Sequence, residues 1–171
     1  MWLLPIAFMI HDFEEIIMMR PWYLKNGAYL KARFPRFFNR MSSTAGLSTP
    51  AFSLAVLGEF VILSAATLAC VELGAYPAWA AVAVIFLVHN VVHIGSFFIV
   101  GRYVPFVITG VITSAYPIYA LATLYGGGYL VPQDVMVWLA VALVPAGIGF
   151  FIIIRAAARF DRWLERWSVP G

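Results

Sequence analysis

The chain contains 171 residues, of which 63% are hydrophobic and only 11% are charged. Soluble domains contain about 25% charged and roughly 45–50% apolar residues, so a soluble core of this size could not bury so much apolar surface. The single cysteine, Cys70, excludes a disulfide framework. We therefore expect one all-α domain over residues 1–171, built as a polytopic membrane helix bundle.

Five segments are predicted to be transmembrane helices, because a span needs about 20 mostly apolar residues. The first is the weakest, since histidine and acidic residues interrupt it, whereas the other four are strongly apolar. In chain order the predicted spans are 2–19, 50–71, 78–100, 105–125 and 134–154. A basic loop, 20–49, follows the first span, and a basic tail, 155–171, follows the last. Both are rich in aromatic residues, which favours amphipathic segments on an anionic membrane surface over nucleic-acid binding.

Lysine and arginine predict the orientation of the spans. With five spans, all eleven of them fall in regions on one side of the membrane, namely the basic loop, the position of Arg102 and the basic tail. The loops on the opposite side contain none. Under the positive-inside rule we therefore expect the C-terminus in the cytoplasm and the N-terminus outside.

The first span carries the polar run His11-Asp12-Phe13-Glu14-Glu15. On a helix, His11, Glu14 and Glu15 share a face about 100° wide, and the i, i+4 pair His11 and Glu15 can converge on one point. Ionisable residues inside a bilayer are costly, so they usually face the protein interior and mark ion, proton or substrate chemistry. We leave Asp12, which lies beside this face, outside the predicted site.

The third span carries a second i, i+4 pair, His89 and His93. This is the spacing that the zinc-binding histidines of many helical protease sites use. The sequence is not that protease motif, because Asn90 stands where those proteases have a glutamate base.

Ionisable groups of three spans are predicted to lie at one depth in the bilayer. His11 lies nine residues before Arg20, and His93 lies nine residues before Arg102. Glu59 lies nine residues into the second span, which runs in the opposite direction. With a rise of about 1.5 Å per residue, all three fall at one level. Glu59 is thus expected to approach His11 or His93, although a purely structural role is an alternative for it.

The run HDFEE at positions 11–15 resembles the motif that names the HXXEE family of small, very hydrophobic bacterial membrane proteins. That family also has a further histidine, which His89 or His93 would supply, and a Tyr-X-Pro-Gly motif. Residues 103–106 read YVPF at the expected place, so Phe106 replaces the glycine. The resemblance covers about residues 2–125. It implies a bacterial inner membrane location and importance for the motif residues, but supplies no reaction.

The first functional hypothesis is a metal-dependent membrane enzyme. A divalent metal, zinc or alternatively iron, would activate water for the hydrolysis or isomerisation of a lipid or other apolar substrate that arrives sideways. Three histidines are too few for the histidine-rich desaturase or hydroxylase pattern. The predicted metal ligands are His11, Glu15, His89 and His93, Glu14 is the predicted catalytic base, and Glu59, Asn90 and Tyr103 are the residues predicted to surround them.

Two alternatives use the same cluster. A proton-coupled or cation transporter could relay its cargo through these groups, although no inverted repeat is visible and a chain of this size would need to oligomerise. A haem protein with His11 and His93 as axial ligands is the weaker alternative, because clustered carboxylates make a poor haem pocket. In every case we expect the lipid bilayer as a partner and no nucleic acid.

Overall fold

The computed structural model describes residues 1–36 and 46–168, and the described part is helical without any strand. This confirms the predicted all-α class. Its five helices are α1 (Leu3–Arg33), α3 (Thr49–Glu72), α4 (Tyr76–Val100), α5 (Val107–Gly126) and α6 (Pro132–Trp167). Four of them, α3 to α6, are long and apolar enough to cross a membrane, which indicates a membrane protein. Helix α1 falls short by that measure, because the acidic residues of the 11–15 run interrupt its apolar stretch.

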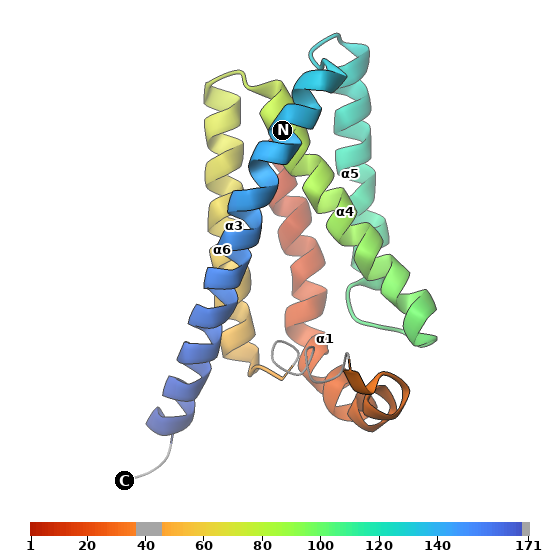
Figure 1. The fold of residues 1–171 in the computed structure, drawn as a ribbon, viewed down its shortest axis with the longest axis vertical. Helices are drawn as coiled ribbons and strands as arrows, with labels where there is room; N and C mark the ends of the chain where they lie inside the picture. The colour runs from red at the N-terminus through yellow and green to blue at the C-terminus, as the bar shows by residue number, and fades with distance from the viewer. Residues whose placement is uncertain (37–45, 169–171) are drawn as a thin grey trace.

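Helix α1 extends further than the predicted first span, because it continues to Arg33 through Pro21. Figure 1 shows that its second part (orange) departs from the direction of its first part (red). A proline inside a helix removes one backbone hydrogen bond and commonly causes such a bend. The start of the predicted basic loop is therefore helical. Likewise, α6 runs without a break to Trp167, past the predicted end of the last span.

The second part of α1 holds the connection between α4 and α5. The indole Nε1 of Trp22 donates to the carbonyl oxygen of Tyr103 at 2.6 Å. Arg102 donates from Nη1 to Oδ1 of Asn26 at 3.2 Å, and its guanidinium lies 3.8 Å from the ring centroid of Tyr29. These contacts fix the loop that carries Tyr103, and this loop lies next to the polar cluster described below.

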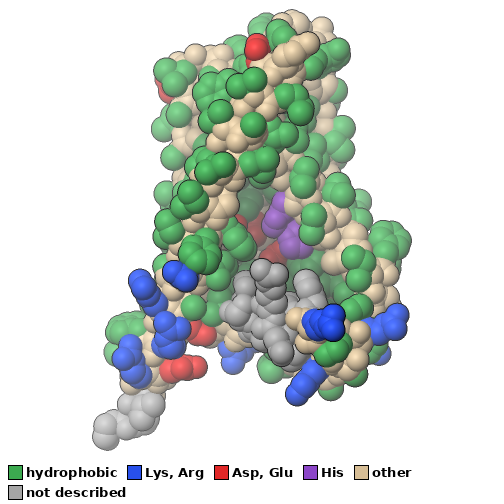
Figure 2. All heavy atoms as spheres, in the orientation of Figure 1, with side chains coloured by type: hydrophobic (Ala, Val, Ile, Leu, Met, Phe, Trp, Pro, Cys, Tyr) green, Lys and Arg blue, Asp and Glu red, His purple; other side chains and the backbone are tan. Residues whose placement is uncertain are grey.

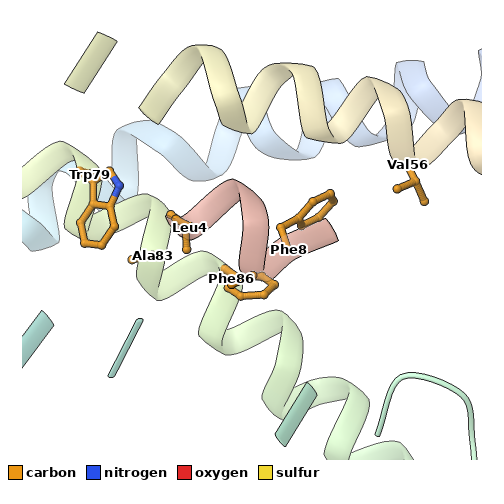
Figure 3. Packing of buried hydrophobic residues seen from close by; sticks show 7 residues of the cluster. Leu4, Phe8, Val56, Trp79, Ala83 and Phe86 are labelled. Atoms are coloured by element: carbon orange, nitrogen blue, oxygen red, sulfur yellow. The ribbon is translucent and has the colours of Figure 1, made fainter. Parts of the chain in front are cut away.

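The first part of α1 packs between α3 and α4 through a compact apolar cluster (Figure 3). Leu4 and Trp79 are completely buried there, and Ala80, Ala81 and Ala83 of α4 are buried as well. The backbone of α1 lies mainly against α3 and α5, and that of α4 mainly against α5 and α6, so α1 and α4 meet chiefly through the side chains of this cluster. This packing sets the distance and rotation of α1 relative to α4.

The outer surface separates apolar from basic residues. In Figure 2, hydrophobic side chains cover the upper part of the visible face, and the lysine and arginine side chains gather at its lower end. Helix α6 contributes much of the apolar surface, because none of the residues in its most apolar stretch is buried. The predicted orientation, with this basic end in the cytoplasm, stays a prediction.

Candidate metal centre

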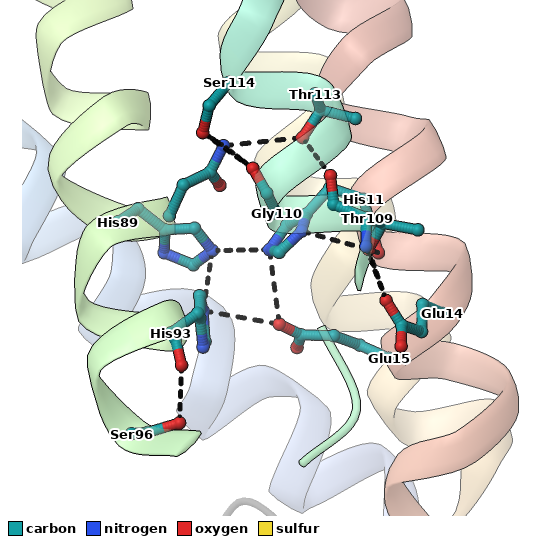
Figure 4. Close-up of polar contacts among 11 residues, drawn as sticks. His11, Glu14, Glu15, His89, His93, Ser96, Thr109, Gly110, Thr113 and Ser114 are labelled. Carbon is teal, nitrogen blue, oxygen red and sulfur yellow. Dashed lines mark hydrogen bonds and ion pairs between the residues drawn. The ribbon is translucent and has the colours of Figure 1, made fainter. Parts of the chain in front are cut away.

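Two helices supply four polar side chains that point toward one another (Figure 4). His11 and Glu15 lie one turn apart on α1, and His89 and His93 lie one turn apart on α4. His11 is 0% exposed and Glu15 is 6% exposed, so both are withdrawn from the surface. The i, i+4 spacing puts each pair on one helix face, as predicted, and the packing of α1 beside α4 brings the two faces together.

The four ligand atoms form a closed ring of short contacts, which we call the quartet. His11 Nε2 lies 3.3 Å from His89 Nε2, and His89 Nε2 lies 2.8 Å from His93 Nε2. Oε1 of Glu15 lies 3.5 Å from His11 Nε2 and 3.3 Å from His93 Nε2. All four atoms lie within 4.8 Å of one another. Ligands about 2.0–2.1 Å from a tetrahedral ion are roughly 3.3 Å apart, so the quartet could hold one metal ion.

Hydrogen bonding alone does not satisfy these four atoms. Oε1 of Glu15 is buried and has no hydrogen-bond partner, although two imidazole nitrogens lie near it. No lysine or arginine forms an ion pair with Glu15 in the described part of the chain. A buried carboxylate without a partner is expensive. Three imidazole nitrogens and one carboxylate oxygen directed at a common point are instead a donor set typical of a divalent cation.

The other side of the His11 ring is connected to Glu14 through Thr109 of α5. Nδ1 of His11 lies 3.3 Å from Oγ1 of Thr109, and Thr109 donates from Oγ1 to Oε2 of Glu14 at 2.6 Å. If Nε2 bound an ion, Nδ1 would carry the proton and donate to Thr109. Such carboxylate-supported hydrogen bonds orient histidine ligands in metal sites and raise their basicity.

Glu14 therefore faces the beginning of α5 and not the quartet. Its carboxylate also accepts from the backbone N–H of Thr109 at 2.9 Å and from the hydroxyl of Tyr103. Helix α5 has no side-chain cap of its own, so Glu14 satisfies one of its free N–H groups. Burial and the bond to Glu14 raise the pKa of Tyr103 to about 12, which keeps its hydroxyl a donor near neutral pH. The role of Glu14 as a base stays a prediction.

Thr109 was missed by the sequence analysis. It lies four residues before Thr113 at the beginning of a helix, just after the YVPF run. The predicted depths bring together only groups at the level of His11, whereas Thr109 reaches the His11 ring from one turn before Thr113. A hydroxyl residue in the first turn after this motif was the available signal.

Asn90 lies on a different face of α4 from the two histidines. Its Nδ2 donates to Ser114 Oγ at 3.0 Å, to the carbonyl oxygen of Gly110 at 3.3 Å and to Thr113 Oγ1 at 3.4 Å. It thus joins α4 to α5. At Gly110 a Cβ atom would lie 3.5 Å from the His11 ring, which shows how closely α5 approaches the quartet.

Two further carboxylates lie near the quartet. Asp12 is only 3% exposed, and its Oδ2 has no hydrogen-bond partner. Glu59 lies close enough to Asp12 and Glu15 for their charges to interact. No hydrogen bond or ion pair with His11 or His93 is found for Glu59 among the described residues. Asp12 is buried beside the predicted face because α3 packs along that flank of α1.

A cavity of about 470 Å³ adjoins the quartet at His89. Glu59 and His89 are the polar members of its wall, which helices α1, α3, α4 and α6 build together. In Figure 2 the histidine and acidic side chains are visible at the bottom of a hollow in the surface. The remaining wall is apolar: Phe8, Ile62, Leu63, Ala66, Val82, Ile85, Phe86, Ala142, Pro145, Ala146, Gly149, Phe150 and Ile153.

Phe106, which replaces the glycine of the Tyr-X-Pro-Gly motif, has a backbone that favours glycine. Its φ is 91°, in the left-handed region, where a side chain costs about 1–2 kcal/mol. The residue immediately precedes α5 and is buried. Its ring centroid lies 4.0 Å from that of His93, so the aromatic side chain covers one ligand of the quartet. Aromatic pairs contribute about 0.5–1.5 kcal/mol, which is similar in size to the cost of the backbone conformation.

Comparison with known proteins agrees with the resemblance that the sequence suggests. Residues 2–122 match the profile of a family described as "Protein of unknown function with HXXEE motif". The matched part includes the quartet, Thr109 and the loop with Tyr103. The comparisons with curated proteins and with solved structures gave no match. Because the profile covers well over half of the chain, the protein is a member of the HXXEE family.

Proposed function

We propose that the protein is a metal-dependent membrane enzyme that holds one zinc ion in the quartet and acts on an apolar substrate. The observation that carries this proposal is the convergence of three imidazole nitrogens and the unpartnered Oε1 of Glu15 within 4.8 Å. Three nitrogens and one oxygen in a compact arrangement suit zinc, with iron as the alternative. A bound cation would also neutralise the buried charge of Glu15.

Because the quartet already supplies four ligands, a reacting oxygen would have to join the zinc as a fifth ligand, an expansion that catalytic zinc sites can undergo. Bound zinc would lower the pKa of a coordinated water to about 7 and polarise a substrate carbonyl. The cavity reaches the quartet at His89, so a water or a substrate oxygen can approach there as a further ligand. Hydrolysis is therefore the reaction that we favour. Glu14 and Thr109 would hold His11 in the orientation that this chemistry needs.

Metal analysis of the purified full-length chain tests the proposal. We expect about one zinc per chain in protein prepared without chelators, and loss of that zinc in His93→Ala and Glu15→Gln. Glu72→Gln is the matched control, because Glu72 is an exposed glutamate at the end of α3. A protein that binds neither zinc nor iron at micromolar concentration would refute the proposal. An absorption band of haem in the same sample would replace it with the haem alternative.

A proton-coupled or cation transporter is the second candidate. It is favoured by Asp12, whose buried Oδ2 has no hydrogen-bond partner and which a single zinc site does not use. Such a carboxylate inside a membrane protein is typical of a proton or ion path. Flux measurements in liposomes distinguish the two candidates. Cation or proton flux that Asp12→Asn abolishes while zinc content stays unchanged would favour transport.

For the orientation we propose a cytoplasmic C-terminus and an external N-terminus. The support is the gathering of basic side chains at one end of the molecule (Figure 2). Reporter fusions check it. A reporter that is active only in the cytoplasm should be active when it is fused after residue 168 and inactive when it is inserted at the turn near Gly127. A reporter that is active only outside should give the opposite result at both positions. The reverse pattern would overturn this topology.

A further inference from the structure

We propose that the cavity between α3, α4 and α6 binds the hydrocarbon chain of a neutral long-chain amide, with the amide group between Glu59 and His89. The cavity volume of about 470 Å³ is in the range of small-molecule sites, about 300–1,000 Å³. The choice of an amide as substrate rests on the proposed metal centre. Binding of the chain in the cavity does not require a metal.

The polar residues of the cavity lie at one end of it. Helix α3 runs away from the basic end of the molecule, and Glu59 is the first of its residues in the wall. Helix α4 runs toward the basic end, and His89 is the last of its residues in the wall. The opposite end is formed by residues such as Ala66, Val82 and Ala142, which are apolar. A ligand with one polar group and a long apolar chain matches this distribution.

Small residues of α6 leave space for the hydrocarbon chain of the ligand. Ala142, Ala146 and Gly149 recur at helical spacing on the face that lines the cavity. A Cβ atom at Gly149 would lie 3.7 Å from Ile62 Cδ1, an ordinary contact, so a larger side chain there would extend into the cavity. Gly147 on the same helix does not line the cavity, and a Cβ atom there meets nothing within 4 Å.

The cavity is open toward the side of the bundle. Helices α4 and α6 pack against each other and diverge toward the basic end (Figure 1), and the hollow of Figure 2 lies where they diverge. Both helices are long and apolar enough to span a bilayer, and in that placement we infer that the opening between them faces hydrocarbon. An uncharged ligand can enter from the bilayer, whereas a charged headgroup would have to leave the membrane surface at high cost.

The polar end favours an amide over an ester. Glu59 forms no hydrogen bond with a described residue, so its carboxylate is free to accept one from an amide N–H. The carbonyl oxygen then faces His89 and the quartet. In the hydrolysis that this arrangement supports, the oxygen of water bonds to the carbonyl carbon and the C–N bond breaks. The nitrogen takes a proton from the water, so the products are a fatty acid and an amine.

Photolabelling tests the inference on the full chain in lipid nanodiscs. The probe is a saturated long-chain primary amide with a diazirine at the far end of its chain. We expect the label on residues at the apolar end, near Ala66, Val82 and Ala142. Gly149→Leu should reduce labelling about tenfold, and Gly147→Leu should leave it unchanged. Label spread over the outer faces of the helices, or equal labelling of both variants, would overturn the inference.

Competition tests the head group. The unlabelled amide should displace the probe better than a methyl ester of the same chain, and Glu59→Leu should remove this preference. Equal competition by the ester, or by a phospholipid with matched chains, would overturn the amide. Chemical cross-linking that placed a second copy of the chain over Phe150 and the cavity, with no probe bound, would overturn the ligand site itself.

The proposed metal centre and the proposed binding site for the hydrocarbon chain, here called the chain site, can be refuted separately. His93→Ala should lose zinc but keep the label in the cavity, because His93 is not part of the cavity wall. Label in the cavity of a protein that binds no metal would refute the proposed enzyme and leave the chain site standing. Zinc in the quartet without specific labelling would refute the chain site alone. Mapping the label on the unmodified chain keeps the test valid even if Gly149→Leu fails to fold.

Discussion

Helices α1 and α4 build two neighbouring regions of opposite character. Near their apolar ends, Leu4 and Trp79 are completely buried in an apolar cluster. About two to three turns further along α1, the same pair of helices forms the quartet, in which Glu15 Oε1 has no hydrogen-bond partner. The side chains of the apolar cluster pack against one another, and only the indole Nε1 of Trp79 lacks a hydrogen-bond partner among them, whereas the quartet directs four donor atoms toward a point that could hold a cation. The packing of the apolar cluster therefore helps to position α1 and α4, the two helices that carry the quartet.

The largest effect that distinguishes the two regions is expected from His93→Ala. In zinc at a thousandfold excess over its dissociation constant, the native state of the wild type gains about 4 kcal/mol, and the variant should lose most of this. Thermal unfolding with and without a chelator measures it. With chelator, the two proteins should unfold at similar temperatures. A His93→Ala protein that zinc stabilises as strongly as the wild type would contradict the quartet as a metal site.

Leu4→Ala should give the second largest effect, in the other region. Lipid solvates apolar groups well, so the main cost is the unfilled cavity, and we expect about 2 kcal/mol. The loss should be the same with zinc and with chelator, because Leu4 belongs to the apolar cluster and not to the quartet. A loss that depended on zinc would mean that the two regions are not energetically separate.

Sequence alone predicted the membrane helix bundle and the two histidine-containing helix faces that meet. Both follow from hydropathy and from the i, i+4 spacing, which depend only on local sequence. Helices α1 and α6 continue past the predicted ends of their spans, because charged residues mark the edge of the bilayer and a helix can continue beyond it. Local sequence therefore predicts where a membrane span ends more reliably than where its helix ends.

The contact of Glu14 with α5 could not be predicted in the same way. Glu14 and Glu15 both lie on the predicted face, but Glu15 reaches the quartet and Glu14 reaches α5. That separation depends on how α1 is rotated relative to α4 and α5, which tertiary packing decides. The burial of Asp12 has the same origin, since α3 covers the flank where the helical wheel places it.

Thr109→Val tests whether the support of His11 matters to the quartet. The change keeps the shape of the side chain and removes the hydroxyl that connects His11 Nδ1 to Glu14. Loss of such a supporting hydrogen bond typically costs about 10- to 100-fold in metal affinity, and we expect zinc binding to weaken by that factor. Competition with a chelating dye measures it. Thr123→Val is the matched control, because Thr123 is an exposed threonine further along α5. Equal zinc affinities for the two variants would remove Thr109 from the metal centre.

The smallest effect is expected at Phe106, where backbone strain and side-chain contact oppose each other. Both Phe106→Gly and Phe106→Ala remove the ring that lies against His93, but only glycine adopts a φ of 91° without strain. The glycine variant should therefore be more stable than the alanine variant by about 1 kcal/mol. Thermal unfolding of both proteins in chelator measures the difference without the contribution of zinc. In both variants His93 loses its aromatic cover, so a chelator should remove zinc faster than from the wild type. An alanine variant at least as stable as the glycine variant would show that this backbone conformation is not retained in the protein.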